Sequence, residues 1–251
     1  MWDQLQALFP GLDWSLVLVY ARVQACILML PALGERVIGA RVKVALAMAM
    51  TPLLSGIAPG TAMPADPLGM GAQIGAEMLL GFATGTMLRL LALSINLATT
   101  AIAATASLSQ IMGVQNEMSP HPIGNMLHLG GLAILMALGL PVMLVELIAD
   151  SLTLWPPASL PRAEGLAMAV VGIVSDSFWL ALMLAAPFTL GGFLYQALSG
   201  VINRVMPNLP VVFIGAPASI MLALLGLAVM APLLVGIWAD AVLGFMLPPI
   251  P

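Results

Sequence analysis

Charged residues are scarce in this sequence. Lys, Arg, Asp and Glu make up 7% of the 251 residues, whereas hydrophobic residues make up 61%. Soluble proteins carry about 25% charged residues, and so few charges cannot cover the surface of a soluble globule. The composition therefore predicts an integral membrane protein and excludes a solvated catalytic domain. The seven basic residues are scattered and the net charge is -4, which argues against nucleic-acid binding.

Cysteine is almost absent too. A lone Cys26 can form no disulfide within the chain and no cysteine metal site, so we expect it to lie in the core. The first residues, MWDQLQALFPGLDW, are acidic where a secretory signal peptide needs basic residues, and no small-residue cleavage site follows. We therefore expect the chain to insert through its mature apolar segments.

Catalytic motifs are also lacking. The sequence has no GxSxG, no HExxH, no phosphate-binding glycine loop and no carboxylate-rich metal motif. Its two histidines, His121 and His128, are separated by a proline and do not have the spacing of two ligands on one helical turn. We expect no enzymatic activity, no metal and no cofactor, and an intramembrane enzyme is the weakest hypothesis.

What is present is a series of long apolar runs. A helix needs about 20 residues to cross about 30 Å of hydrocarbon. The runs therefore predict an all-α integral membrane protein with about six helical spans, long bent helices and a terminal helical hairpin. The expected spans are 14–33, 44–58, 68–110, 126–155, 166–203 and 211–247. No internal repeat at a fixed period is visible, as an inverted-repeat transporter would require.

The third run allows two structures. Residues 68–110 contain no proline, and as one helix they would be about 65 Å long, twice the thickness of the hydrocarbon layer. They form either one long bent helix or a hairpin that breaks near residues 94–100. With one crossing here, Arg36, Arg41, Lys43 and Arg204 lie on one side and only Arg162 on the other. The positive-inside rule then places both termini on the periplasmic side.

Small and polar residues share one helical face of the third run. This predicted polar stripe consists of Gly81, Gly85, Arg89, Asn96, Thr100 and Ser107. Because an Arg side chain against lipid costs at least about 2.5 kcal/mol, the stripe should meet protein or water. It either faces a pore or packs on another helix through the GxxxG motifs at 71–75 and 81–85. Arg22 and Asp176 also lie deep in apolar runs, so each is expected to pair with another helix or subunit.

A polar loop, MGVQNEMSPHPIGN at 112–125, separates two strongly apolar runs. Methionine side chains are unbranched and polarizable, which suits a surface that must seal around changing partners. Among the 19 methionines, Met112 and Met118 lie in this loop and are the candidates for such a seal.

Three stretches resemble one known family. GERVIGARVKVALAMAMTPLL at 34–54 is similar to its basic loop and second span, and SQIMGVQNEMSPHP at 109–122 is similar to its central loop. The most specific stretch is LSGVINRVMPNLPVVFIGAP at 198–217, which matches the family pattern at Asn203, Arg204, Pro207, Phe213, Ile214, Gly215 and Pro217. Over nearly its whole length the chain resembles the FliR family, the export-gate subunit of the flagellar type III secretion apparatus, called SctT in virulence systems.

The resemblance implies a non-enzymatic, single-copy subunit of the bacterial inner membrane, within the flagellar basal body. With FliP-type and FliQ-type subunits it would form a channel for unfolded flagellar proteins. A FliB/FlhB-type switch subunit, the exported proteins and membrane lipid are the other implied partners. Residues 1–125 would be FliP-like and include a central plug loop at about 107–125, and residues 126–251 would include a FliQ-like hairpin at about 166–247.

The resemblance also implies roles for individual residues. The implied pore plug or seal consists of Gln110, Met112, Gln115, Met118, Pro120 and Pro122. The motif from Asn203 to Pro217 would lie at a cytoplasmic turn. The central loop departs from the family pattern, because Ser119-Pro120 and His121-Pro122 stand where the family has Asp-Pro. A secondary transporter that uses Arg22, Arg89 or Asp176 for a small substrate is the alternative function, and the lack of repeats argues against it.

Overall fold

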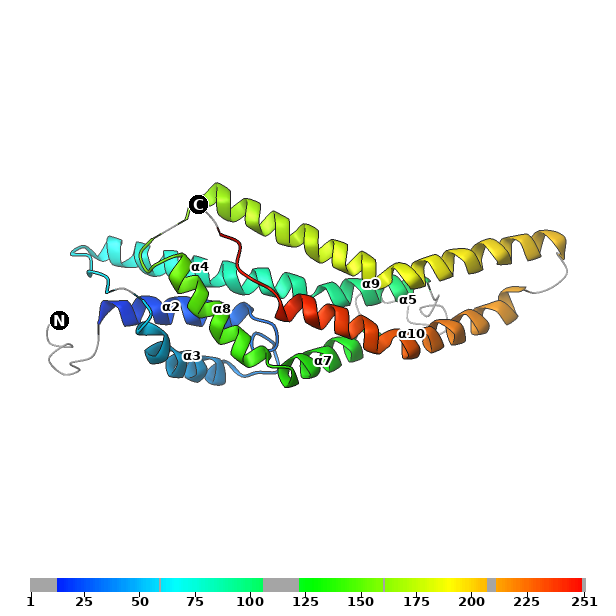
Figure 1. Ribbon diagram of the computed structural model, residues 1–251, viewed down its shortest axis with the longest axis horizontal. Coiled ribbons are helices and arrows are strands. Elements are labelled where there is room, and N and C mark those ends of the chain that lie inside the picture. The colour runs from blue at the N-terminus through cyan, green and yellow to red at the C-terminus, as the bar shows by residue number, and fades with distance from the viewer. Residues whose placement is uncertain (1–12, 59, 106–121, 160, 207–210, 250–251) are drawn as a thin grey trace. The chain divides into compact units, whose positions relative to one another are not determined.

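The structure is a computed structural model that describes all residues except 1–12, 59, 106–121, 160, 207–210 and 250–251. In the described ranges the chain forms helices joined by turns and short connections, which confirms the all-α prediction (Figure 1). The helices are α2 (Trp14–Met29), α3 (Ala40–Ser55), α4 (Pro67–Ala92), α5 (Ser94–Thr105), α7 (Pro122–Ala137), α8 (Leu140–Leu154), α9 (Ala163–Val205) and α10 (Val211–Leu243).

The chain divides into two compact units. Unit 1 comprises Met1–Leu91, Met136–Val174 and Leu243–Pro251, and therefore contains α2, α3, α8, nearly all of α4 and the start of α9. Unit 2 comprises Ala92–Leu135 and Ser175–Val242, and therefore contains α5, most of α7, the rest of α9 and nearly all of α10. Each unit is built from segments that are far apart in the sequence.

Unit 1 is organised around α2. Asp13 caps this helix by accepting a hydrogen bond from the backbone N–H of Trp14 at 2.7 Å. The buried side of α2 includes fully enclosed apolar side chains, namely Leu18, Val19, Val23 and Ile27. The next helix, α3, packs along α2 (Figure 1) and buries Ala47, Met50 and Leu54. Full burial of one such side chain stabilises the fold by about 1.5–3 kcal/mol.

Unit 2 has its core around a tryptophan. Trp238 of α10 is fully buried, and the other buried apolar side chains of the unit include Ile95 and Ala98 of α5, Leu132 and Leu135 of α7, and Val242 of α10. Phe188 of α9 approaches α10 at Gly226, where an added Cβ would lie 3.6 Å from the ring. This approach is one contact between α9 and α10 within the unit.

Among the described residues, three helical segments are long and apolar enough to cross a membrane: Pro67–Ile102, Ala163–Val205 and Met221–Leu243. The segments Asn125–Ala137 and Leu140–Leu154 pass that test only together, because they are bent by 77°. Gly139 lies at this bend with a φ of 104°, which glycine adopts without steric cost. The expected six spans are not confirmed. The 16 residues of α2 or α3 make a helix of only about 24 Å.

The third apolar run is one long helix with a break. In the described part of the run, α4 and α5 continue as the apolar segment Pro67–Ile102, and the interruption falls at Leu93. The alternative hairpin at 94–100 does not form.

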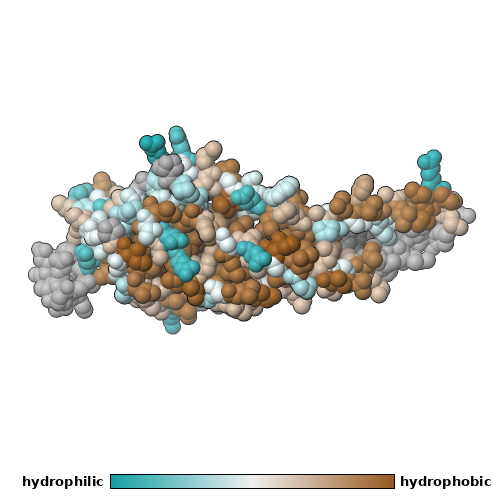
Figure 2. Space-filling view, in the orientation of Figure 1, coloured by the Kyte–Doolittle hydropathy of each residue, from teal (hydrophilic) through white to brown (hydrophobic). Residues whose placement is uncertain are grey.

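Apolar side chains are exposed along α9 and α10. Only 17% of the most apolar window of α9 is buried, and 11% of that of α10. Figure 2 shows hydrophobic residues over much of the visible face, with few hydrophilic ones between them. Exposed apolar surface on this scale is covered by lipid or by another protein.

Candidate functional site

A buried ion pair lies within unit 1. Arg22 on α2 donates from Nε to Oε2 of Glu77 on α4 at 2.6 Å, and both side chains are fully buried. Arg22 lies on the buried side of its helix, one turn after Leu18 and one turn before Cys26. Removing two charges from water costs several kcal/mol per ion, so such a pair is stable only when its other polar atoms also find partners.

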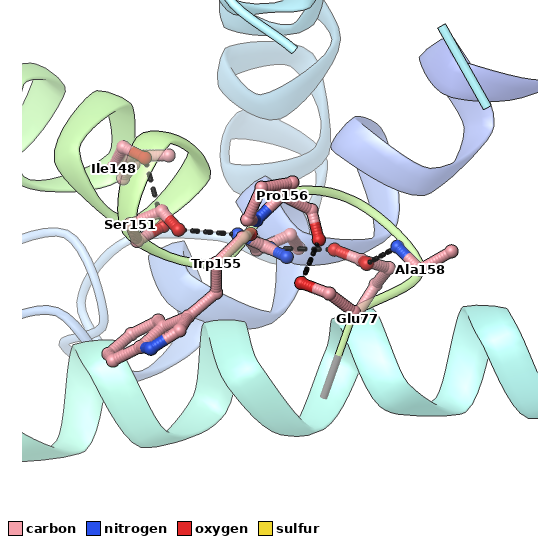
Figure 3. Close-up of polar contacts among 8 residues, drawn as sticks. Glu77, Ile148, Ser151, Trp155, Pro156 and Ala158 are labelled. Atoms are coloured by element: carbon pink, nitrogen blue, oxygen red, sulfur yellow. Dashed lines mark hydrogen bonds and ion pairs between the residues drawn. The ribbon is translucent and has the colours of Figure 1, made fainter. Parts of the chain in front are cut away.

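Those further partners are backbone groups at the end of α8 (Figure 3). Arg22 Nη1 donates to the carbonyl oxygens of Ser151 and Trp155, at 2.7 Å each. Glu77 Oε1 accepts a hydrogen bond from the backbone N–H of Ala158 at 2.8 Å. A cation is favoured at the C-terminal end of a helix, where carbonyl groups lack intrahelical donors. The pair therefore joins α2, α4 and the end of α8.

The turn after α8 is shaped around this pair. Ala158 has a φ of 66°, a left-handed conformation that is uncommon for residues other than glycine. Its N–H donates to Glu77 (Figure 3). The hydroxyl of the neighbouring Ser159 donates to Pro156 O at 2.6 Å. Strained backbone of this kind persists where its surroundings fix it. Here the fixing contact is the buried carboxylate of Glu77.

One donor of the site is left over. Arg22 Nη2 is buried and has no hydrogen-bond partner among the described residues. The expectation that Arg22 pairs with another helix is confirmed, but sequence reasoning did not identify Glu77. The signal was present, because Glu77 is the only acidic residue of α4. Asp176, which carried the same expectation, is exposed on α9 and has no ion pair in the described part of the chain.

The first two residues of the predicted polar stripe lie where α4 packs on α2. A Cβ on Gly81 would clash with the backbone carbonyl of Arg22, and one on Gly85 would lie 2.7 Å from the carbonyl oxygen of Cys26. Gly71 and Gly75, the other GxxxG pair, have open space around them. Only the second motif therefore brings two helices into close contact within unit 1.

The other stripe residues have different surroundings. Arg89 Nη2 lies 3.6 Å from Glu35 Oε1, and both side chains are about 30% exposed. In unit 2, Asn96 is half-buried, and the exposed Thr100 donates its hydroxyl to the Asn96 carbonyl at 2.8 Å. Ser107 lies outside the described residues. The described members of the stripe are thus partly buried helix contacts and partly surface groups.

The predicted plug and motif residues are placed only in part. Gln110, Met112, Gln115, Met118 and Pro120 lie outside the described residues, and Pro122 is the first residue of α7. Asn203 and Arg204 are exposed in the last turn of α9. Pro207 lies outside the described residues, whereas Phe213, Ile214, Gly215 and Pro217 belong to the first two turns of α10. The motif therefore brackets the connection between α9 and α10.

Long apolar helices, exposed apolar faces and a buried interhelical ion pair together define an integral membrane protein. The profile of the family described as "Bacterial export proteins, family 1" matches residues 14–244, so the chain belongs to this family. It is similar to the flagellar biosynthetic protein FliR of Caulobacter vibrioides. The two are 29% identical over 227 residues, which cover 89% of this chain and 90% of that protein.

Proposed function

We propose that this chain is the single-copy subunit of a flagellar protein-export gate in the bacterial inner membrane. With FliP-type and FliQ-type subunits it forms the channel through which unfolded flagellar proteins cross, and a FliB/FlhB-type switch subunit is a further partner. One observation carries the proposal: the family match runs from residue 14 to residue 244 and agrees with a FliR relative over 89% of the chain. The likeness is therefore to a whole subunit and not to one motif.

The surface of α9 supports an assembly. Within unit 2, one face of this helix exposes residues that are all apolar except the first: Asp176, Trp179, Met183, Pro187, Leu190, Leu194 and Leu198. Their spacing of three or four residues keeps them on one side of the helix. Lipid would cover the apolar part and leave the carboxylate of Asp176 unpaired, whereas a protein helix with a Lys or Arg would cover both. This face therefore fits a neighbouring subunit that presents an apolar helix with one Lys or Arg side chain.

The proposal includes the topology expected from the sequence. The chain crosses the membrane six times, with α2 and α3 contributing short crossings inside the assembly, and both termini are periplasmic. Residues 1–125 form the FliP-like part, and 126–251 form the second part with the FliQ-like hairpin at 166–247. The connection between α9 and α10, with Arg204, then lies on the cytoplasmic side.

In this proposal the segment between α5 and α7 closes the channel. The residues in the seal are Gln110, Met112, Gln115, Met118, Pro120 and Pro122. The face of Arg89, Asn96, Thr100 and Ser107 is proposed to line the path that leads to it. Deleting residues 112–120 should make the assembled gate conduct ions in a planar bilayer. If the deleted gate conducts no more than the intact one, the plug assignment is wrong.

The experiment that tests the function itself is native mass spectrometry of the tagged chain, extracted from its own membranes in mild detergent. The expected result is a heteromeric complex with one copy of this chain. A monomer or homodimer that recurs in several detergents would contradict the export gate and favour a transporter. Arg22 argues against a transporter, because its guanidinium is fully buried and its Nε and Nη1 are bonded to Glu77 and to two backbone carbonyls.

A further inference from the structure

The break between α4 and α5 has none of the usual causes in its own sequence. α4 ends at Ala92, α5 begins at Ser94, and the residues around Leu93 include neither proline nor glycine. Helices are interrupted at Pro, at Gly or Ser pairs, at π-bulges, or where a side chain or a water inserts into the backbone hydrogen bonds. An inserted group is therefore the cause to look for.

Trp238 provides that group. Its indole Nε1 donates to the carbonyl oxygen of Ala92 at 3.0 Å, from a position 146 residues further along the chain. In an uninterrupted helix the Ala92 carbonyl would accept from the backbone N–H of Asn96. That N–H donates instead to the carbonyl of Leu93 at 3.0 Å. The indole has thus taken the place of a backbone donor.

A glycine on α7 makes room for the indole. Trp238 is fully buried, and a Cβ on Gly131 would lie 2.7 Å from its Cζ3 and 3.1 Å from its Cη2. The preceding residue, Gly130, has nothing within 4 Å of the same position. The indole therefore lies between the end of α4 and α7, and only one of two adjacent glycines is needed to make room for it.

The break leaves one polar group unsatisfied. The hydroxyl of Ser94, the first residue of α5, is buried without a hydrogen-bond partner among the described residues. Within a continuous helix a serine hydroxyl can donate to the carbonyl four residues earlier. A continuous α4–α5 helix is thus a competing arrangement that would satisfy this group, and the indole hydrogen bond opposes it.

We propose that Trp238 is a positioning residue that keeps the helix broken at Leu93 and so fixes how α5 begins. Two donors, the indole N–H of Trp238 and the backbone N–H of Asn96, compete for the carbonyl of Ala92. The indole gives the broken state and the backbone N–H gives the continuous one.

The test is amide hydrogen exchange over residues 94–97 in the purified complex. Trp238→Phe keeps an aromatic ring but removes the donor, and Gly131→Ala pushes the indole away. Both should slow exchange of the Asn96 amide about fivefold, because its bond to the carbonyl three residues back, Leu93, is replaced by the regular helical bond to Ala92, four residues back. Gly130→Ala, at the adjacent glycine with open space around it, is the matched control and should leave it unchanged.

Whether exchange of the Asn96 amide becomes slower or faster distinguishes the proposal from a merely structural role. A merely structural role for Trp238 predicts faster exchange, because lost packing loosens the helix, and faster or unchanged exchange in both variants would overturn the proposal.

Discussion

Arg22 of unit 1 carries a charge that is fully buried. Its charge is balanced by Glu77, and its Nη1 binds two carbonyls at the end of α8. A pair of this kind is not by itself a large source of stability, because desolvation offsets much of the attraction. Replacing only one residue of the pair is costly, because the charge of the other residue then stays buried without a counterion. Single and double substitutions should therefore behave differently.

We expect Arg22→Met to lower the free energy of unfolding by about 3–5 kcal/mol, because the carboxylate of Glu77 is left uncompensated. The double variant Arg22→Met/Glu77→Leu should be more stable than the single one, although Ala158 then loses an acceptor. The measurement is unfolding of the purified chain in mixed micelles. Arg89→Met is the control, since its partly exposed contact with Glu35 is worth less than about 1 kcal/mol. A double variant less stable than Arg22→Met would contradict this account.

From the sequence we could predict that Arg22 needs a partner of opposite charge, but not that the partner is Glu77. An isolated charge in an apolar run is costly wherever it occurs, so Arg22 and Asp176 gave the same signal. Which of them pairs within the chain depends on the register of helices 55 residues apart, and that register is set by packing and not by local sequence. Glu77 was recognisable as a lone carboxylate in an apolar helix, but its distance from Arg22 was not.

At the scale of elements, α4 is the helix whose environment changes most along its length. Its glycines at 81 and 85 meet the backbone of α2, whereas those at 71 and 75 are open. The sequence predicted helix packing at both GxxxG motifs alike, because the motif shows only that a close approach of two helices is allowed. The break at Leu93 could not be predicted from the local sequence either, because the side chain that causes it, Trp238, lies 146 residues from Ala92 in the sequence. Long-range contacts thus decide how a uniform apolar run is divided.

The two GxxxG motifs give a direct test. Gly81→Ala should destabilise the chain by about 1–3 kcal/mol, because the new methyl group overlaps the carbonyl of Arg22 and displaces the helix that carries the ion pair. Gly75→Ala should be neutral or stabilising by up to about 1 kcal/mol, because alanine favours the helix and meets nothing. Unfolding in micelles measures both. Equal effects of the two substitutions would show that α4 does not pack on α2 through Gly81.

At the scale of the whole molecule, the two units bury few of the apolar side chains of α9 and α10. Seventeen per cent burial of the most apolar part of α9 leaves large side chains such as Phe193 and Leu194 exposed. Family membership and this surface lead to the same conclusion from independent observations, since one rests on sequence likeness and the other on packing. The chain is expected to complete its core within an assembly, where α2 and α3 are also shielded from lipid.

Asp176 tests that conclusion, because it is the one charge on the exposed apolar face of α9 in unit 2. If a basic residue of a neighbouring subunit binds it, Asp176→Lys places like charges together and should reduce the partner subunits recovered with the tagged chain at least about tenfold. Asp176→Asn should have a smaller effect. Glu164→Lys, in the exposed first turn of the same helix, is the matched control and should assemble normally. The comparison is made by native mass spectrometry at equal expression. Full assembly of Asp176→Lys would mean that solvent or lipid headgroups cover this face, and the docking surface would then have to lie elsewhere.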